Sequence, residues 1–136
     1  MRFGICTNSA GLLSLRNAGF DFGEFTLNEI AALTDGAFID LQKLSDKIGI
    51  SIEASNGFFP WSMRVIGSEA DQSEIKRYVR RAISRAAEIG IAVSVVGNGG
   101  SRRIPDGMEL LEAERQFTIM QDVTDTTEED TRGPSV

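Results

Sequence analysis

The chain has 136 residues, a formal net charge of −6, 41% hydrophobic and 25% charged residues, which fits a globular domain with its own core. It contains one cysteine, so an internal disulfide is excluded, and no histidine, so a Ser-His-Asp triad or a histidine-based zinc site within the chain is excluded. No stretch reaches the roughly 18 apolar residues of a membrane span and no signal-peptide pattern opens the sequence, so we expect a cytoplasmic protein without a membrane partner.

The first third of the chain alternates strand-like and helix-like segments. Residues 2–6 form a short apolar run typical of a buried strand, and residues 12–18 place leucines on one helical path. Residues 20–25 alternate aromatic and polar side chains, which predicts a second strand. Residues 26–33 open with the Thr-x-x-Glu spacing of a capping box, which predicts a short helix.

The middle of the chain predicts two longer helices around a third strand. Residues 34–48 and residues 71–89 each carry an apolar stripe and each is followed by a glycine. Between them, residues 50–54 read as a strand. The polar side of the second helix carries five basic residues, which we interpret as a solvated face: Lys76, Arg77, Arg80, Arg81 and Arg85.

The last third begins with a fourth strand and ends in an acidic segment. Residues 91–97 form the strand, and apolar spacing predicts a final helix that reaches residue 120. Residues 121–136 hold five acidic residues and one arginine, and we predict a disordered tail there. The remaining body, residues 1–120, is nearly neutral, so nucleic acid is not an expected partner.

The order of these elements predicts the class of fold. Strand and helix alternate four times, which indicates parallel strands joined by right-handed helical crossovers. Two α/β architectures remain, an open doubly wound sheet and part of a (β/α)8 barrel, whose complete form needs about 250 residues.

Ligands of both architectures bind at the carboxyl ends of the strands. Those positions hold Cys6, Glu24, Glu53 and Asn56. Each also has a plain structural interpretation. Cys6 fits a small buried hydrophobe, Glu24 fits an edge salt bridge, Glu53 fits a solvent-facing strand position, and Asn56 fits a turn.

The loop after the fourth strand combines glycines with two adjacent cations: Gly97, Asn98, Gly99, Arg102 and Arg103. It has neither the P-loop pattern nor the spacing of a dinucleotide fingerprint. An amide-rich loop with two guanidinium groups suits a sugar hydroxyl, a carboxylate or a phosphate, and a purely structural turn is the alternative.

Four segments together resemble a known family. They are "RFGICT", "AGFDFGEF", "IEASNGFFP" and "AAEIGIAVSVVGNGGSRRIPDG", in that order. In order and spacing they resemble the xylose isomerase-like TIM barrels, which are sugar or sugar-phosphate isomerases and epimerases. The resemblance extends from Met1 to about Phe117 and indicates the N-terminal half of a (β/α)8 barrel.

The resemblance implies a metal-dependent enzyme that moves protons next to a sugar carbonyl, with carboxylates as acid and base. Glu24, Asn56 and residues 97–103 would then line the substrate end of the barrel. In this family the metal ligands are Glu, Asp, His and Glu from later strands, which this chain lacks. We therefore expect no metal or other cofactor within this chain, no assigned catalytic residue, and catalytic incompleteness of the single chain.

Three functional hypotheses follow. The first is a truncated sugar isomerase or epimerase. The amino-acid composition changes abruptly after about Phe117, as expected at a shortened or frame-shifted end. The second is a half-barrel that self-associates and keeps sugar or anion binding. The third is a free-standing α/β binding module. Half a barrel leaves its first and fourth strands with open edges, so we also expect a homodimer or an aggregation-prone protein.

Overall fold

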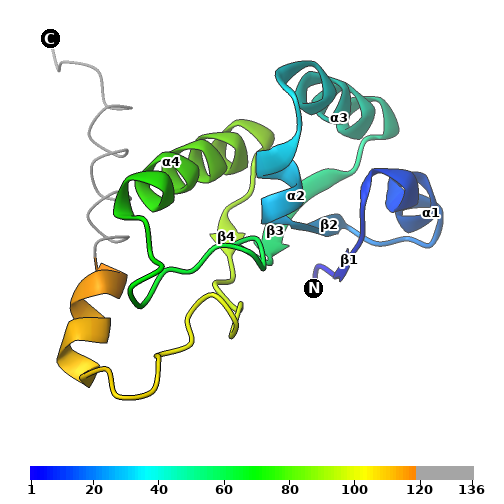
Figure 1. Ribbon diagram of the computed structural model, residues 1–136. Helices are drawn as coiled ribbons and strands as arrows, with labels where there is room; N and C mark the ends of the chain where they lie inside the picture. Colours follow the sequence, from blue (N-terminus) through cyan, green and yellow to red (C-terminus); the bar gives the residue numbers. More distant parts are fainter. Residues whose placement is uncertain (119–136) are drawn as a thin grey trace, which may run out of the picture. The chain divides into compact units, whose positions relative to one another are not determined.

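Four parallel strands form one sheet in the order β1-β2-β3-β4 in the computed structural model, which describes residues 1–118 (Figure 1). The strands are β1 (Gly4–Cys6), β2 (Phe22–Thr26), β3 (Ser51–Asn56) and β4 (Val93–Ser94). Each pairs in parallel with the next one along the chain. This confirms the predicted order, and it excludes a doubly wound sheet, in which the first strand would lie inside. The predicted tail and the boundary at residue 120 lie outside the described residues.

Helical segments connect the strands, as the alternation predicts. They are η1 (Ser9–Gly11), α1 (Leu12–Asn17), α2 (Leu27–Ala32), α3 (Asp35–Ile48) and α4 (Gln72–Ile89), and residues 110–118 are also helical. Over residues 1–118, none of these helices has both the length and the apolar character needed to cross a bilayer. The fourth strand is shorter than the predicted 91–97, because only Ala54 and Ser55 of β3 pair with it.

Local sequence signals determine the ends of the two long helices. The Thr34 hydroxyl accepts a hydrogen bond from the Ala37 amide at 3.2 Å and caps α3, while the Asp71 carboxylate caps α4. Each helix ends at a glycine with positive φ, 71° at Gly49 and 94° at Gly90. An L side chain rarely adopts this conformation, so the glycines stop the helices.

The predicted capping box at the start of α2 is wrong. Thr26 is the N-cap residue, yet its side chain makes no cap hydrogen bond. Thr26 is also the last residue of β2, where it pairs with Asn56. The Asn28 amide instead donates to the carbonyl oxygen of Gly57 at 3.1 Å. A backbone carbonyl from outside the helix therefore satisfies one of the free amides at the start of α2.

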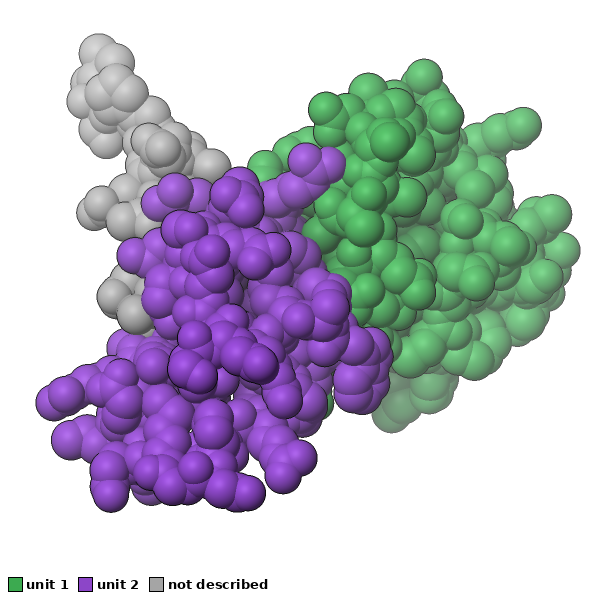
Figure 2. All heavy atoms as spheres, viewed as in Figure 1, with its two compact units in different colours: residues 1–58, 84–97 green, residues 59–83, 98–136 purple. Residues whose placement is uncertain are grey.

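The described chain divides into two compact units (Figure 2). Unit 1 comprises residues 1–58 and 84–97 and holds the whole sheet. Unit 2 comprises residues 59–83 and the chain from residue 98 onward. Helix α4 contributes residues to both.

One face of the sheet in unit 1 is packed. Along β2, buried residues alternate with half-buried ones, as expected when one face meets helices and the other does not. Phe25 of β2 and Ile52 of β3 belong to the buried set. The other buried apolar side chains of this core come mainly from the helices: Leu12, Leu15, Leu27, Ile30, Ala31, Phe38, Leu41 and Ala86.

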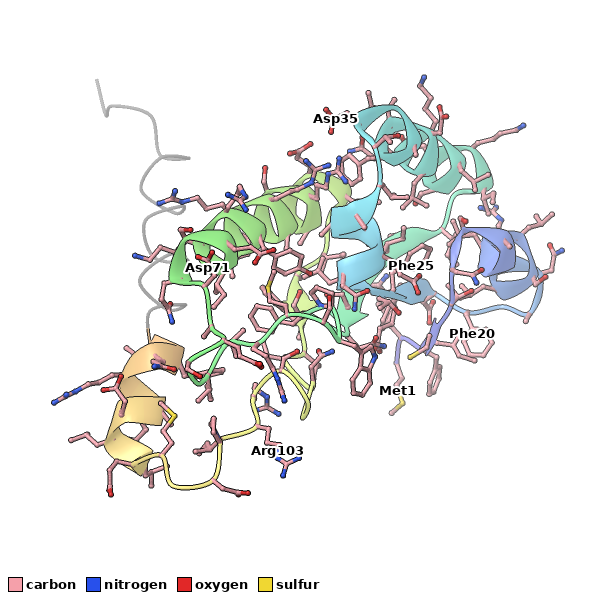
Figure 3. All side chains as sticks on the ribbon, in the orientation of Figure 1. Met1, Phe20, Phe25, Asp35, Asp71 and Arg103 are labelled. Atoms are coloured by element: carbon pink, nitrogen blue, oxygen red, sulfur yellow. The ribbon has the colours of Figure 1, made fainter. Side chains whose placement is uncertain are left out.

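Arg85 is part of this core, contrary to the prediction of a solvated basic face. It is only 5% exposed. Its guanidinium donates to the carbonyl oxygens of Ile30 at 2.8 Å and Leu33 at 2.6 Å, and to the Asp35 carboxylate at 2.7 Å. Asp35 is the first residue of α3 and is labelled in Figure 3. The Arg85 guanidinium also lies over the Phe38 ring, 4.9 Å from the centroid. The fixed fork of donors lets arginine serve the carbonyls at the end of α2 from a buried position.

Hydrogen bonds link the two segments of unit 2, and each of them involves at least one backbone group. The Asn98 side chain is buried, and its amide nitrogen donates to the Phe59 carbonyl at 2.7 Å. The Val65 amide donates to the Ser101 carbonyl at 3.0 Å. The Gly67 amide donates to the Gln116 side chain at 2.7 Å. These bonds order a segment whose sequence predicted only a loop.

Arg85→Met should destabilise the fold because the buried charged hydrogen bonds disappear. We expect a loss of about 3 kcal/mol in the free energy of unfolding, the value of one or two charged hydrogen bonds, measured by urea denaturation followed by circular dichroism. Asp35→Asn should cost little, since that carboxylate is 90% exposed. The exposed Arg80→Met is the matched control, and equal losses for Arg85 and Arg80 would contradict this role.

Candidate functional site

Three polar side chains gather where β1, β2 and β3 end. Cys6 is the last residue of β1 and is the register partner of Glu24 in β2. Asn56 is the last residue of β3. Because the strands are parallel, their carboxyl ends lie at one edge of the sheet. The structure thus brings together two residues predicted for the site, Glu24 and Asn56, and adds Cys6.

The Asn56 amide connects the three residues. Its nitrogen donates to Glu24 Oε1 at 2.7 Å and approaches the Cys6 sulfur at 3.5 Å. Within residues 1–118, Asn56 Oδ1 has no protein donor, whereas the Glu24 carboxylate accepts from Asn56 and also forms a hydrogen bond with the Cys6 thiol. Both side chains are half-buried. The cluster therefore presents the Asn56 amide oxygen and the remaining lone pairs of the Glu24 carboxylate to a ligand.

The backbone beside the cluster is constrained by Gly57. Its φ is 54°, and a Cβ there would lie 2.8 Å from the Thr26 methyl group. The Asn28 side chain donates to the Gly57 carbonyl at 2.7 Å. A larger residue would be strained and would push against β2, so the glycine and Asn28 together hold Asn56 in place.

Cys6 differs from the sequence-based interpretation as a buried hydrophobe, because it is exposed. Desolvation around the sulfur, and after it the nearby Glu24 carboxylate, raise the pKa of the thiol, while the bond from Asn56 opposes the rise. A raised pKa keeps the group protonated near neutrality. The protonated thiol is a weak hydrogen-bonding group of the cluster.

Glu53 stays apart from the cluster. It is the extra residue of a register irregularity between β2 and β3, and Arg2 binds its carboxylate through both terminal guanidinium nitrogens, NH1 at 2.7 Å. These hydrogen bonds lower the pKa of the Glu53 carboxyl. Of the two acidic residues predicted near the site, only Glu24 reaches it.

The glycine loop, residues 97–103, is divided between the two units. Gly97 belongs to unit 1, whereas Asn98, Gly99 and the two arginines belong to unit 2. Neither Gly97 nor Gly99 has positive φ, and a Cβ on either would meet no close contact. The backbone therefore does not require these glycines. Asn98 is engaged with the Phe59 backbone.

The two arginines of the loop face different cavities. Arg103 lines a cavity of about 260 Å³ with Arg64, Glu69 and Asp106, so two acids accompany the two cations. Arg102 lines a cavity of about 360 Å³ whose other walls are mostly apolar. The arginines therefore do not converge on one anion. Arg64 was not predicted from the sequence as a site residue, because the loop around it contains no motif and no regular spacing of apolar residues.

No three His, Cys, Asp or Glu side chains among residues 1–118 come close enough together to hold a metal ion. The cluster at the strand ends supplies one carboxylate and one thiol, which is fewer ligands than a divalent metal site uses.

No protein-family model matches the sequence, and no curated protein matches it. Comparison with solved structures gives a different result. A D-psicose 3-epimerase, crystallised in the presence of D-fructose, matches with a TM-score of 0.69 at 14% identity, over 93% of this chain and 49% of its own. A 3-keto-D-glucoside 4-epimerase from E. coli matches with a TM-score of 0.61 at 14% identity, over 95% and 51%.

The chain has the fold of part of a TIM barrel. It spans about half the length of the two solved structures it matches. The resemblance to xylose isomerase-like barrels that the four strand-end segments indicated is confirmed for the fold. In such barrels the carboxyl ends of the strands form the ligand-binding face, which is where Cys6, Glu24 and Asn56 meet.

The reactivity of Cys6 tests the geometry of the cluster. Glu24→Gln should lower the thiol pKa and speed alkylation by iodoacetamide near neutral pH, because a nearby negative charge is removed. Asn56→Ala should raise the thiol pKa further, because a donor to the thiolate is lost. The pH–rate profile of alkylation measures both shifts. Glu53→Gln is the control and should leave the profile unchanged; a shift equal to that of Glu24→Gln would contradict the arrangement.

Proposed function

We propose that the ends of β1, β2 and β3 bind hydroxyl groups of a neutral sugar, in a protein of the sugar isomerase or epimerase type. The observation that carries the proposal is the Glu24–Asn56 pair, bonded at 2.7 Å at the strand ends. It occurs on a fold shared with sugar epimerases. The pair would position the substrate.

The chemistry of the pair favours a hydroxyl-bearing ligand. The Asn56 amide oxygen and the Glu24 carboxylate both accept hydrogen bonds, and a sugar offers O–H donors on adjacent carbons. A carboxylate repels an anion, and the cluster contains no cation to offset that repulsion. A phosphate group would therefore not bind at the cluster itself, although a sugar phosphate could place its sugar there.

The solved structures support the same class of ligand. One of them is named for D-psicose and was crystallised with D-fructose, and the other is named for a keto-glucoside. Each name describes a carbohydrate with a carbonyl group flanked by hydroxyls. We infer that this chain recognises a ketose or keto-sugar.

Positioning is distinct from turnover. Moving a proton next to a carbonyl requires a base to remove it and an acid to return it, on suitable faces of the substrate. The cluster supplies one carboxylate, Glu24, and the described residues do not fit a divalent metal. Binding without turnover by this chain alone is therefore the expected behaviour, and it also describes the alternative of an α/β binding module.

Titration with D-fructose and D-psicose, followed by amide chemical shifts in NMR spectra, tests the binding. We expect shifts at Cys6, Glu24 and Asn56. Asn56→Ala should weaken the affinity by about tenfold, or about 1.4 kcal/mol. Glu53→Gln, a carboxylate change on the same strand away from the cluster, should leave it unchanged. Shifts confined to unit 2, or equal shifts with inorganic phosphate, would contradict sugar binding at the cluster.

The isolated chain should show no metal-dependent epimerase activity. Incubation with either ketose and Mn²⁺, Mg²⁺ or Co²⁺, followed by chromatography of the products, is the measurement. The physical reason is the missing ligand set and the lack of a second proton-transferring group in the cluster. Product formation that a chelator abolishes and that Glu24→Gln reduces would show instead that the chain is catalytic.

A further inference from the structure

The sheet of unit 1 has two edges, one along β1 and one along β4. Among the described residues, β1 pairs only with β2, and β4 pairs only with β3. The Asp21 amide donates to the Phe3 carbonyl, and the Thr7 amide donates to the Glu24 carbonyl. Because an extended strand alternates direction, the backbone groups of Gly4 and Cys6 then point away from β2, toward the edge.

Both edges carry exposed apolar side chains. Phe3 is 59% exposed and Ile5 is 46% exposed on the β1 side, while Val93 is 62% and Val95 is 53% exposed on the β4 side. Residues 3–6 and 91–96 contain no proline and no charged side chain. Natural edge strands usually carry such residues, which prevent pairing with another chain. With exposed apolar side chains and neither proline nor charge, both edges are suited to pair with a strand of another chain.

We propose that the occupant of both edges is a second copy of this chain, with β4 of one copy pairing in parallel with β1 of the other. A two-fold axis that coincides with the barrel axis repeats this β4–β1 contact, so the dimer has two equivalent seams, each formed by β4 of one copy and β1 of the other. Four strands from each copy give eight, the number in a closed (β/α)8 barrel. Closure leaves no edge unpaired.

The order of the strands explains why a second copy fits better than an unrelated partner. The β1 edge needs a parallel neighbour, and so does the β4 edge, and each copy carries one of each. The two epimerases of the same fold are about twice as long as this chain, so two copies match the amount of chain in one barrel.

Closure would also change the candidate site. The Cys6–Glu24–Asn56 cluster lies at the strand ends of half a ring, and β1, which carries Cys6, is itself a seam strand. In the dimer, strand ends of the second copy would complete the ring around each cluster. The dimer does not depend on sugar binding, and its failure would leave the sugar titration unaffected.

Sedimentation velocity over a range of concentrations tests the proposal. The wild-type chain should sediment as a dimer. Ile5→Lys and Val93→Lys place a charge at each edge and should weaken self-association at least tenfold. Ile39→Lys is the matched control, because Ile39 is 47% exposed on α3, close to the 46% of Ile5. It should leave the dimer intact.

Three results would overturn the proposal: a monomer at every concentration, equal effects of all three lysine variants, or a ladder of larger species in place of a dimer. Circular dichroism of each variant shows whether it is folded. If an edge variant unfolds, hydrogen exchange of the wild-type chain tests the proposed strand pairing instead. The amides of Gly4 and Cys6 should gain protection as concentration rises, and unchanged exchange would reject the seam.

Discussion

Parallel pairing of consecutive strands is the constraint on which the rest of unit 1 depends. Two parallel neighbours cannot be joined by a tight turn, so the chain must return through a helical crossover each time. The crossovers bury one face of the sheet, and the carboxyl ends of the strands meet at one edge. Glu24 and Asn56 are 32 positions apart in sequence, and this topology places them within one hydrogen bond of each other.

A buried arginine, Arg85, hydrogen-bonds the free carbonyl groups at the end of one crossover helix, α2. Helix α2 is only six residues long, so its final carbonyl groups form a large share of its backbone. Arg85, from α4, donates to carbonyls at that end and contacts Phe38 of α3. One side chain thus joins α2, α3 and α4 within unit 1. Its length lets the charged head reach carbonyls while its stem packs among apolar groups.

Among residues 1–118, the same pairing leaves the sheet open along β1 and β4. A (β/α)8 barrel satisfies every strand by closing on itself, and a sheet of four strands cannot do so alone. The strand-end cluster and the open edges are therefore linked properties of one architecture. The proposed sugar positioning would use the ends of the strands, and the proposed self-association would use their sides.

The sequence by itself determined the elements and their order. Helix ends at Gly49 and Gly90, caps at Thr34 and Asp71, and the strand–helix alternation are local signals, read from neighbouring residues. Four strand-end segments also indicated the barrel family, and the solved structures confirm that fold. These features could be predicted because each depends on residues close together in the chain.

Only the tertiary structure decided which polar groups meet. It placed Cys6 beside Asn56, withdrew Arg85 from solvent and engaged Asn98 with the Phe59 backbone. It also left Thr26 without a cap hydrogen bond and placed the Gly57 carbonyl, from a distant loop, against the Asn28 amide at the start of α2. Each outcome depends on contacts between residues 29 or more positions apart. Local periodicity does not encode such contacts; the register of the strands and the packing of the crossovers create them.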